Sequence, residues 1–198
     1  MSNFWERLID LAHGFLVSLN QRPKGSVVTL GYQTKLGSGY SVENERKEKS
    51  EKLNILCLQL INEFPSKDFD GDGKVDETYC NFAVQKAARY YGYKLFDNKN
   101  ANSITEYLEL GLATWHKDNG LRAAYHAMIG GLAIAAKKYP KHGHVAVIAP
   151  RPCEFSGSWG KEVPIVANVG KKNGFMKVSE AFPVKDGEPG YYLYGETV

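Results

Sequence analysis

The sequence predicts an α+β fold in which N-terminal helices pack on a small antiparallel sheet. Apolar residues recur at helical spacing through most of the first two thirds of the chain, whereas short runs rich in valine and tyrosine lie in the last third. Helices and strands do not alternate along the chain, which disfavours a doubly wound parallel sheet. The 198 residues, 43% of them hydrophobic, suffice for one domain with a substantial core.

The expected helices are read from this periodicity and from their stop signals. Pro65 fits the end of the second helix, and Gly92 is the predicted C-cap of the third. The predicted helical segments are 1–20, a segment ending near Phe64, Cys80–Tyr91, Ile104–Leu112 and Leu121–Tyr139.

The expected strands are short and rich in β-branched or aromatic residues. The last three of them should form the antiparallel sheet. The predicted strands are Ser26–Leu30, His144–Ile148, Val163–Val169 and Gly190–Tyr194.

Charge and apolar content exclude several classes of protein. The net charge of +3 would help approach to an anionic polymer, but it is far too small to indicate a nucleic-acid partner. No apolar run is long enough to cross a membrane. Asp10 and His13 interrupt the apolar N-terminal run, which also lacks a cationic start and a cleavage site. We therefore expect synthesis in the cytoplasm without a recognisable signal peptide.

The three cysteines contain no C-x-x-C pair, so they indicate neither a disulfide framework nor a zinc site. Cys57 lies in an apolar run and is predicted to be a core residue, and Cys153 follows Pro152 in a predicted loop. Cys80 begins a predicted helix, where unpaired N–H groups and the macrodipole favour the thiolate. Cys80 is therefore the candidate nucleophile. The alternative is a half-buried cysteine at a helix end.

His144 and Asn168 are the candidate partners of this cysteine. His144 opens an apolar strand after a glycine, which places its ring at a sheet edge as a candidate base. Asn168 lies inside the next strand, where a buried amide needs a hydrogen-bond partner. If the two strands are neighbours, Asn168 can reach the imidazole and fix its tautomer. The alternatives are a solvated turn histidine and an asparagine that caps the bend toward Gly170. The remaining histidines are interpreted as structural or solvated: His13, His116, His126 and His142.

An acidic loop shortly before Cys80 has the D-x-D-x-D-G spacing of a calcium-binding loop. Its carboxylates would repel one another without a cation, and Gly73 allows the sharp turn. Tyr79 stands at the twelfth position, where a bidentate glutamate is usual. We expect calcium as a cofactor, and the alternative is a solvated acidic turn. The predicted ligands are Asp68, Asp70, Asp72, the backbone carbonyl of Lys74, and Asp76.

The order of these motifs resembles that of the NlpC-like and CHAP superfamily of papain-like cysteine hydrolases. In that superfamily a helix-start cysteine is followed by a Gly-His-Val strand and then by a polar residue on the next strand. The CHAP pattern has an acidic residue and an asparagine after the histidine strand, whereas only Asn168 stands here. Some phage CHAP lysins also carry a calcium loop just ahead of the nucleophile. The resemblance covers residues 68–195, and its matching segments are Thr78–Ala83, Gly143–Val147 and Val166–Asn168.

The resemblance implies a papain-like core in which Cys80 is the nucleophile, His144 the base and Asn168 the residue that orients the ring. Such enzymes are amidases or endopeptidases of bacterial peptidoglycan, found in phage lysins, autolysins and interbacterial toxins. We therefore expect a hydrolase whose partner is peptidoglycan and whose site of action is the cell wall or periplasm. The sequence identifies neither the amide bond that is cut nor an immunity or delivery partner.

The expected organisation is a single domain, residues 1–198. Residues 1–65 form an N-terminal helical extension of unknown role, and residues 66–198 form the catalytic core. Two other functions remain open. A transamidase or acyltransferase would share the Cys–His core but use an amine as acceptor in place of water. A non-catalytic, calcium-stabilised binding module would leave Cys80 unreactive.

Overall fold

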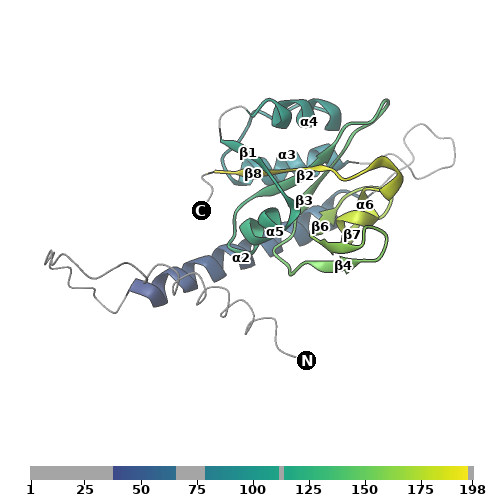
Figure 1. Ribbon diagram of the computed structural model, residues 1–198. Coiled ribbons are helices and arrows are strands. Elements are labelled where there is room, and N and C mark those ends of the chain that lie inside the picture. Colours follow the sequence, from purple (N-terminus) through teal and green to yellow (C-terminus); the bar gives the residue numbers. More distant parts are fainter. Residues whose placement is uncertain (1–37, 66–78, 112–113, 196–198) are drawn as a thin grey trace, which may run out of the picture. The chain divides into compact units, whose positions relative to one another are not determined.

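The computed structural model describes residues 38–65, 79–111 and 114–195, which all belong to one compact unit, residues 37–198 (Figure 1). The described elements are α-helices and antiparallel strands, so the predicted α+β class is confirmed. The predicted first helix, the predicted strand Ser26–Leu30 and the acidic loop lie outside the described residues.

A six-stranded antiparallel sheet forms the centre of the described structure (Figure 1). Strand β3 begins at His144 and pairs with β6, which ends at Asn168. Because neighbouring antiparallel strands run in opposite directions, the start of β3 and the end of β6 lie at the same end of this strand pair. The two strands are therefore neighbours, which is the condition on which the expected contact between Asn168 and His144 depends. In sheet order the strands are β1 (Trp115–Asp118), β8 (Gly190–Tyr194), β2 (Ala133–Lys137), β3 (His144–Ile148), β6 (Ile165–Asn168) and β7 (Gly174–Lys177).

Helices pack around this sheet at positions that support its central strands. Helix α3 packs against β3, and α4 packs against both β2 and β3. Helix α5 contacts β2 and β8, whereas α6 contacts β6 and β7. The helices are α2 (Ser38–Glu63), α3 (Cys80–Tyr90), α4 (Ala101–Glu109), α5 (Gly120–Met128), α6 (Val178–Ala181) and the 3-10 helix η1 (Val184–Asp186).

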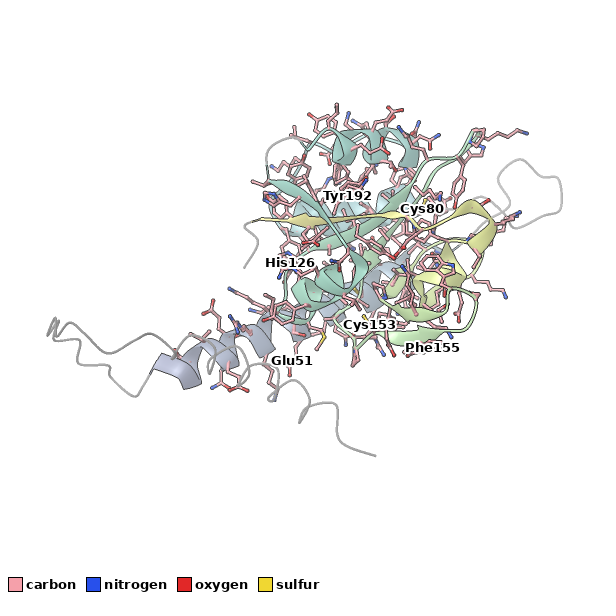
Figure 2. The ribbon with its side chains drawn as sticks, viewed as in Figure 1. Glu51, Cys80, His126, Cys153, Phe155 and Tyr192 are labelled. Carbon is pink, nitrogen blue, oxygen red and sulfur yellow. The ribbon has the colours of Figure 1, made fainter. Side chains whose placement is uncertain are left out.

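Helix α2 contributes one apolar stripe to the core. Leu53, Leu56, Cys57 and Leu60 recur at helical spacing and are at most 3% exposed. Each of these leucines adds about 1.5–3 kcal/mol of hydrophobic stabilisation. Glu51 on the same helix is exposed and points away from the core (Figure 2). Part of the predicted N-terminal extension is thus built into the core of this unit.

Helix α3 ends in a Schellman motif. Gly92 has φ of +81°, its N–H donates to the Arg89 carbonyl at 2.9 Å, and the Tyr93 N–H donates to the Ala88 carbonyl at 2.8 Å. A left-handed conformation of this kind favours glycine, because other residues have a Cβ that opposes it. The predicted end of this helix is confirmed.

The predicted long helix Leu121–Tyr139 is wrong. Its first half forms α5, but its second half forms β2, a central strand that pairs with β3 and β8. Gly130 has φ of +86°, and Gly131 lies so close to His126 that an added Cβ would be 2.2 Å from its Nε2. The chain therefore turns sharply there, and the alanine-rich run beyond it is buried on both faces of the sheet.

The predicted continuous strand Val163–Val169 is also wrong. Pro164 divides it into β5 (Lys161–Val163) and β6. Strand β5 pairs with β4 (Glu154–Ser156) in a separate two-stranded sheet, while β6 joins the main sheet. Proline cannot donate a ladder hydrogen bond, which suits a point where the chain leaves one sheet for another. Phe155 of β4 is 61% exposed and lies at the edge of the described structure (Figure 2).

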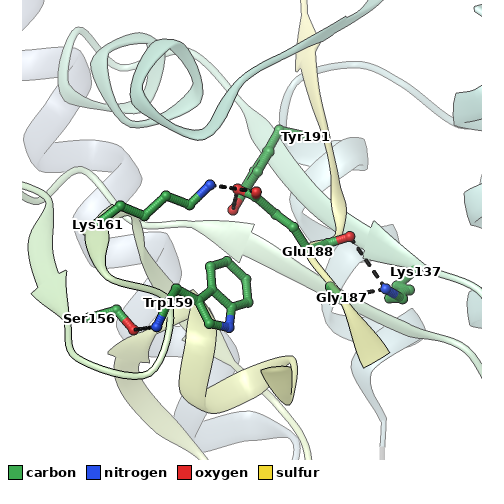
Figure 3. A network of polar contacts seen from close by, with 7 residues as sticks. All are labelled: Lys137, Ser156, Trp159, Lys161, Gly187, Glu188 and Tyr191. Atoms are coloured by element: carbon green, nitrogen blue, oxygen red, sulfur yellow. Dashed lines mark hydrogen bonds and ion pairs between the residues drawn. The ribbon is translucent and has the colours of Figure 1, made fainter. Parts of the chain in front are cut away.

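The segment between η1 and β8 is held by a polar network (Figure 3). The Lys137 ammonium donates to the carbonyls of Asp186 and of Gly187, the latter at 2.9 Å. Lys161 pairs with the Glu188 carboxylate at 2.6 Å, and the Tyr191 hydroxyl donates to the same carboxylate at 3.0 Å. Lys137 is also the strand partner opposite His144. The network therefore fixes the end of β2 beside the strand that carries the candidate base.

Candidate active site

The three predicted catalytic residues come together at one cleft. Cys80 from α3, His144 from β3 and Asn168 from β6 all line a cavity of about 1100 Å³. The other walls come from the N-terminus of α4, the β2–β3 hairpin, the β6–β7 turn and α6. Figure 2 shows Cys80 where α3 meets the sheet. Residues from three elements that are far apart in sequence thus share one site.

Cys80 is the first residue of α3, as the sequence predicts. Its backbone N–H belongs to the first helical turn, whose N–H groups have no acceptor within the helix. The residue is 5% exposed and borders the cleft, so its sulfur is shielded from bulk water without being sealed in the core. The helix dipole at this position favours a negative charge on the sulfur.

Asn168 binds the imidazole of His144 directly. The distance from His144 Nε2 to Asn168 Oδ1 is 2.8 Å. The Asn168 amide nitrogen donates to the Lys172 carbonyl at 2.7 Å, which identifies Oδ1 as the atom that faces the histidine. Nε2 must therefore carry the proton of the neutral ring, and Nδ1 has the free lone pair. Such a ring can accept a proton at Nδ1.

Burial and packing tune this histidine. Burial lowers the pKa of His144, and the hydrogen bond that its ring donates to Asn168 opposes that shift. The imidazole packs against the Phe182 ring with a centroid separation of 4.8 Å. A Cβ added at Gly170 would lie 3.6 Å from His144 Cε1, so the turn after β6 also borders the ring. The ring is consequently held in place and is neutral around pH 7.

Asn173 anchors the turn that follows β6, and sequence reasoning missed it. Its Oδ1 accepts the Gly170 N–H at 3.0 Å. Its amide nitrogen donates to the carbonyls of Ile61 at 3.0 Å and Phe64 at 2.7 Å, which lie at the end of α2. Asn173 therefore caps α2 and fixes the turn that supports Asn168. The Asn-Gly pair indicates a turn from sequence, but its link to a helix 109 residues away has no local signal.

Gly143 lets the β2–β3 hairpin contact the N-terminus of α4. A Cβ at this position would lie 2.4 Å from Asn102 Oδ1 and 2.9 Å from the Asn102 backbone nitrogen. The Asn102 side chain is itself fixed, because it donates to the Tyr139 carbonyl at 2.9 Å and accepts the Tyr139 N–H at 3.2 Å. Gly143 immediately precedes His144, so this contact sets where the candidate base begins its strand.

The other two cysteines are poor nucleophiles. Cys57 is fully buried, and burial raises its pKa to about 12. Cys153 is partly exposed, and burial together with the nearby Glu162 carboxylate raises its pKa to about 11. Both thiols therefore stay protonated at neutral pH, which agrees with the prediction that Cys57 is a core residue.

Of the other described histidines, His126 and His116 do not line the cleft, whereas His142 does. The His126 Nε2 lies 3.1 Å from the Tyr194 carbonyl, and burial lowers the pKa of this ring. His116 is exposed on β1. His142 is exposed at the rim of the cleft. His13 lies outside the described residues.

The predicted calcium ligands, residues 68–76, also lie outside the described residues. Tyr79, at the twelfth loop position, packs its ring 5.8 Å from Phe82 and 6.4 Å from Phe64, centroid to centroid. Within residues 38–65, 79–111 and 114–195, no cluster of three His, Cys, Asp or Glu side chains is placed to hold a metal ion. None of the helices described in these ranges is long and apolar enough to span a bilayer.

Comparison of the sequence with protein-family models and with curated proteins gave no match. The chemistry proposed for the site is therefore argued from its own residues and their geometry.

Proposed function

We propose that this protein is a papain-like cysteine hydrolase of the NlpC-like and CHAP kind, which cleaves amide bonds of bacterial peptidoglycan. The observation that carries the proposal is the 2.8 Å contact between His144 Nε2 and Asn168 Oδ1 in the cleft that Cys80 lines. A helix-start cysteine, an imidazole with a free Nδ1 and an amide that fixes the tautomer are the parts that thiol-based acyl transfer needs.

The proposed reaction has two steps. His144 Nδ1 takes the proton of the Cys80 thiol, and the thiolate attacks the carbonyl carbon of the amide. The Cys80 backbone N–H donates to the developing oxyanion. The tetrahedral intermediate collapses when the protonated ring gives its proton to the leaving amine, which produces a thioester on Cys80. Water, deprotonated by His144, then releases the carboxylic acid and the free thiol.

Peptidoglycan is proposed as substrate because of the motif order and the shape of the site. The cleft is bordered by the β6–β7 turn and by the α4 N-terminus, and its volume of about 1100 Å³ suits a peptide of several residues. The arrangement of a helix-start cysteine packed on an antiparallel sheet agrees with the papain-like core that the sequence resembles.

Calcium is proposed as a structural cofactor bound by the acidic loop. Four aspartate carboxylates and the backbone carbonyl of Lys74 form a set of hard oxygen donors, which suits Ca²⁺. When bound, the ion would neutralise these carboxylates. The loop ends four residues before Cys80, so an ion bound there would lie close in sequence to the start of α3.

The test is digestion of purified sacculi, followed by mass spectrometry of the soluble products. We expect the full chain to release muropeptides, Cys80→Ala to release none, and the matched Cys153→Ala variant to retain activity. Circular dichroism should show that both variants are folded. Retained hydrolysis by Cys80→Ala would refute the assignment. Products that carry an added amine, when one is supplied, would indicate a transamidase instead of a hydrolase.

A further inference from the structure

Helix α2 ends at a point where its own backbone cannot satisfy its last carbonyls. The carbonyls of the last turn of a helix have no partner within that helix. The Ile61 carbonyl would ordinarily accept the N–H of the residue four positions later, but that residue is Pro65, which has none. The side-chain amide of Asn173 supplies a donor, at 3.0 Å from the Ile61 carbonyl and 2.7 Å from the Phe64 carbonyl. A residue of the β6–β7 turn therefore completes the end of α2.

The same side chain also stabilises the conformation of the β6–β7 turn. The Asn173 Oδ1 accepts the Gly170 N–H at 3.0 Å, near the start of the turn. The Lys172 carbonyl, one residue before Asn173, accepts the Asn168 side-chain amide at 2.7 Å. The position of this carbonyl therefore depends on a side chain that binds α2 through its nitrogen and the turn through its oxygen.

The Lys172 carbonyl decides which end of the Asn168 amide faces His144. While it accepts a hydrogen bond from the amide nitrogen, the Asn168 Oδ1 lies 2.8 Å from the His144 Nε2, so Nε2 carries the proton. If this carbonyl moved away, the amide could rotate by about 180° and turn its nitrogen toward the ring. Nε2 would then have to accept a hydrogen bond, and the proton would move to Nδ1. A ring protonated at Nδ1 has no lone pair there with which to deprotonate Cys80.

We propose that Asn173 is a positioning residue of the active site, through which the end of α2 holds His144 in the tautomer that can act as a base. Each step of this chain of contacts is a hydrogen bond or a turn of a few residues, from the α2 carbonyls to Asn173, Asn168 and the imidazole. Helix α2 thereby gains a part in the reaction, in addition to its apolar stripe. That part rests on the proposed hydrolase function, whereas the tautomer of His144 does not.

The test reads the tautomer of His144 by nitrogen NMR of the full chain at about pH 8, where the ring is neutral. Asn173→Ala removes all three hydrogen bonds of the side chain. Asn173→Asp keeps an acceptor for the Gly170 N–H but has no amide to donate to the α2 carbonyls. Asn119→Ala is the matched control, because it removes another asparagine at a helix end. The Asn119 Oδ1 accepts the Arg122 N–H at 3.0 Å at the start of α5, and the residue does not line the cleft.

We expect the unsubstituted chain and Asn119→Ala to show the Nε2–H tautomer alone, and both Asn173 variants to show a mixture with the Nδ1–H tautomer. Circular dichroism identifies a temperature at which the variants are folded, and if Asn173→Ala does not fold, the reading from Asn173→Asp decides. The Nε2–H tautomer alone in both Asn173 variants overturns the proposal. Its retention in Asn173→Asp also overturns it, because the turn would then orient Asn168 without α2. An equal change in Asn119→Ala overturns it as well, because the effect would not be specific to this contact.

Hydrolysis of a soluble muropeptide separates this proposal from the proposed function. We expect both Asn173 variants to lower kcat about tenfold, as for the loss of one hydrogen bond to a group that becomes charged, with KM changing less than about twofold. A tautomer change in the variants, without hydrolysis by the unsubstituted chain, retains the link between α2 and His144 and removes the hydrolase. An unchanged kcat in a folded Asn173→Ala protein retains the hydrolase and removes the positioning role.

Discussion

At the scale of single residues, the tautomer of the His144 imidazole depends on the side chain of Asn168. The amide nitrogen of Asn168 donates to the Lys172 carbonyl, so its oxygen accepts a hydrogen bond from the His144 Nε2–H, and the lone pair of Nδ1 is left to act as a base. The ring is also desolvated, which lowers its pKa and keeps it neutral. A neutral imidazole with a defined tautomer is the form that can deprotonate a thiol.

Replacing Asn168 with alanine should lower kcat/KM about 10- to 100-fold, the range for losing a hydrogen bond to a group that becomes charged in the reaction. Asn168→Asp should restore part of the rate and raise the pKa of His144, because a carboxylate stabilises the imidazolium. The acidic limb of the pH–rate profile would then move to higher pH. An Asn168→Ala protein with unchanged kinetics would show that the contact has no catalytic role.

At the scale of secondary-structure elements, the positions of the candidate catalytic groups depend on close contacts between neighbouring segments. The β2–β3 hairpin meets the N-terminus of α4 through Gly143, and the β6–β7 turn meets α2 through Asn173. These contacts hold the start of β3 and the end of β6 in a fixed relation to α3.

Gly143→Ala should destabilise the protein by about 1–3 kcal/mol, the usual cost of overpacking a tight contact. The Asn102 side chain is hydrogen-bonded to both the carbonyl and the N–H of Tyr139, so it cannot easily move and the hairpin must shift instead. The rate of hydrolysis, measured well below the melting temperature, should therefore also fall. Gly157→Ala is the matched control, since an added Cβ there meets nothing within 4 Å and should change stability by less than about 0.5 kcal/mol. Equal effects of the two substitutions would contradict this explanation.

The secondary-structure elements differ in how far they could be predicted from the local sequence. The C-terminus of α3 was predictable, because a glycine in the left-handed conformation ends a helix by local geometry. The strand β2 was not, because an alanine-rich run favours a helix in isolation. Two neighbouring strands and burial on both faces override that preference, and neither is visible in the local pattern.

The same distinction applies to the candidate site. Cys80 and His144 stand at element ends that their own neighbours in sequence indicate. The contact of Asn168 with His144 followed once the two strands were assumed to pair. Asn173 and Asn102 act on segments remote in sequence, at separations of 109 and 37 residues, so only the folded chain reveals them.

At the scale of the whole molecule, the proposed calcium site and the proposed catalytic site should be coupled. Saturating calcium should stabilise the protein by about 2.7 kcal/mol at a concentration one hundred times its Kd. Chelation should lower both the melting temperature and the rate of hydrolysis, and magnesium should substitute poorly because it keeps its own water shell. Asp70→Asn with Asp72→Asn should remove the response. Chelation that leaves melting temperature and activity unchanged would exclude a calcium-dependent site.

The central claim is that Cys80 is a nucleophile activated by His144, and thiol alkylation tests it most directly. Iodoacetamide labelling of the full chain, read out by mass spectrometry from about pH 5 to about pH 9, reports the thiolate fraction of each cysteine. Cys57 and Cys153, with pKa values raised to about 12 and about 11, should stay unlabelled through most of this range. We predict that Cys80 is labelled fastest, with a midpoint below the ordinary thiol pKa of about 8.5, and that His144→Ala removes this advantage. Labelling of Cys80 no faster than that of Cys153 would contradict the account.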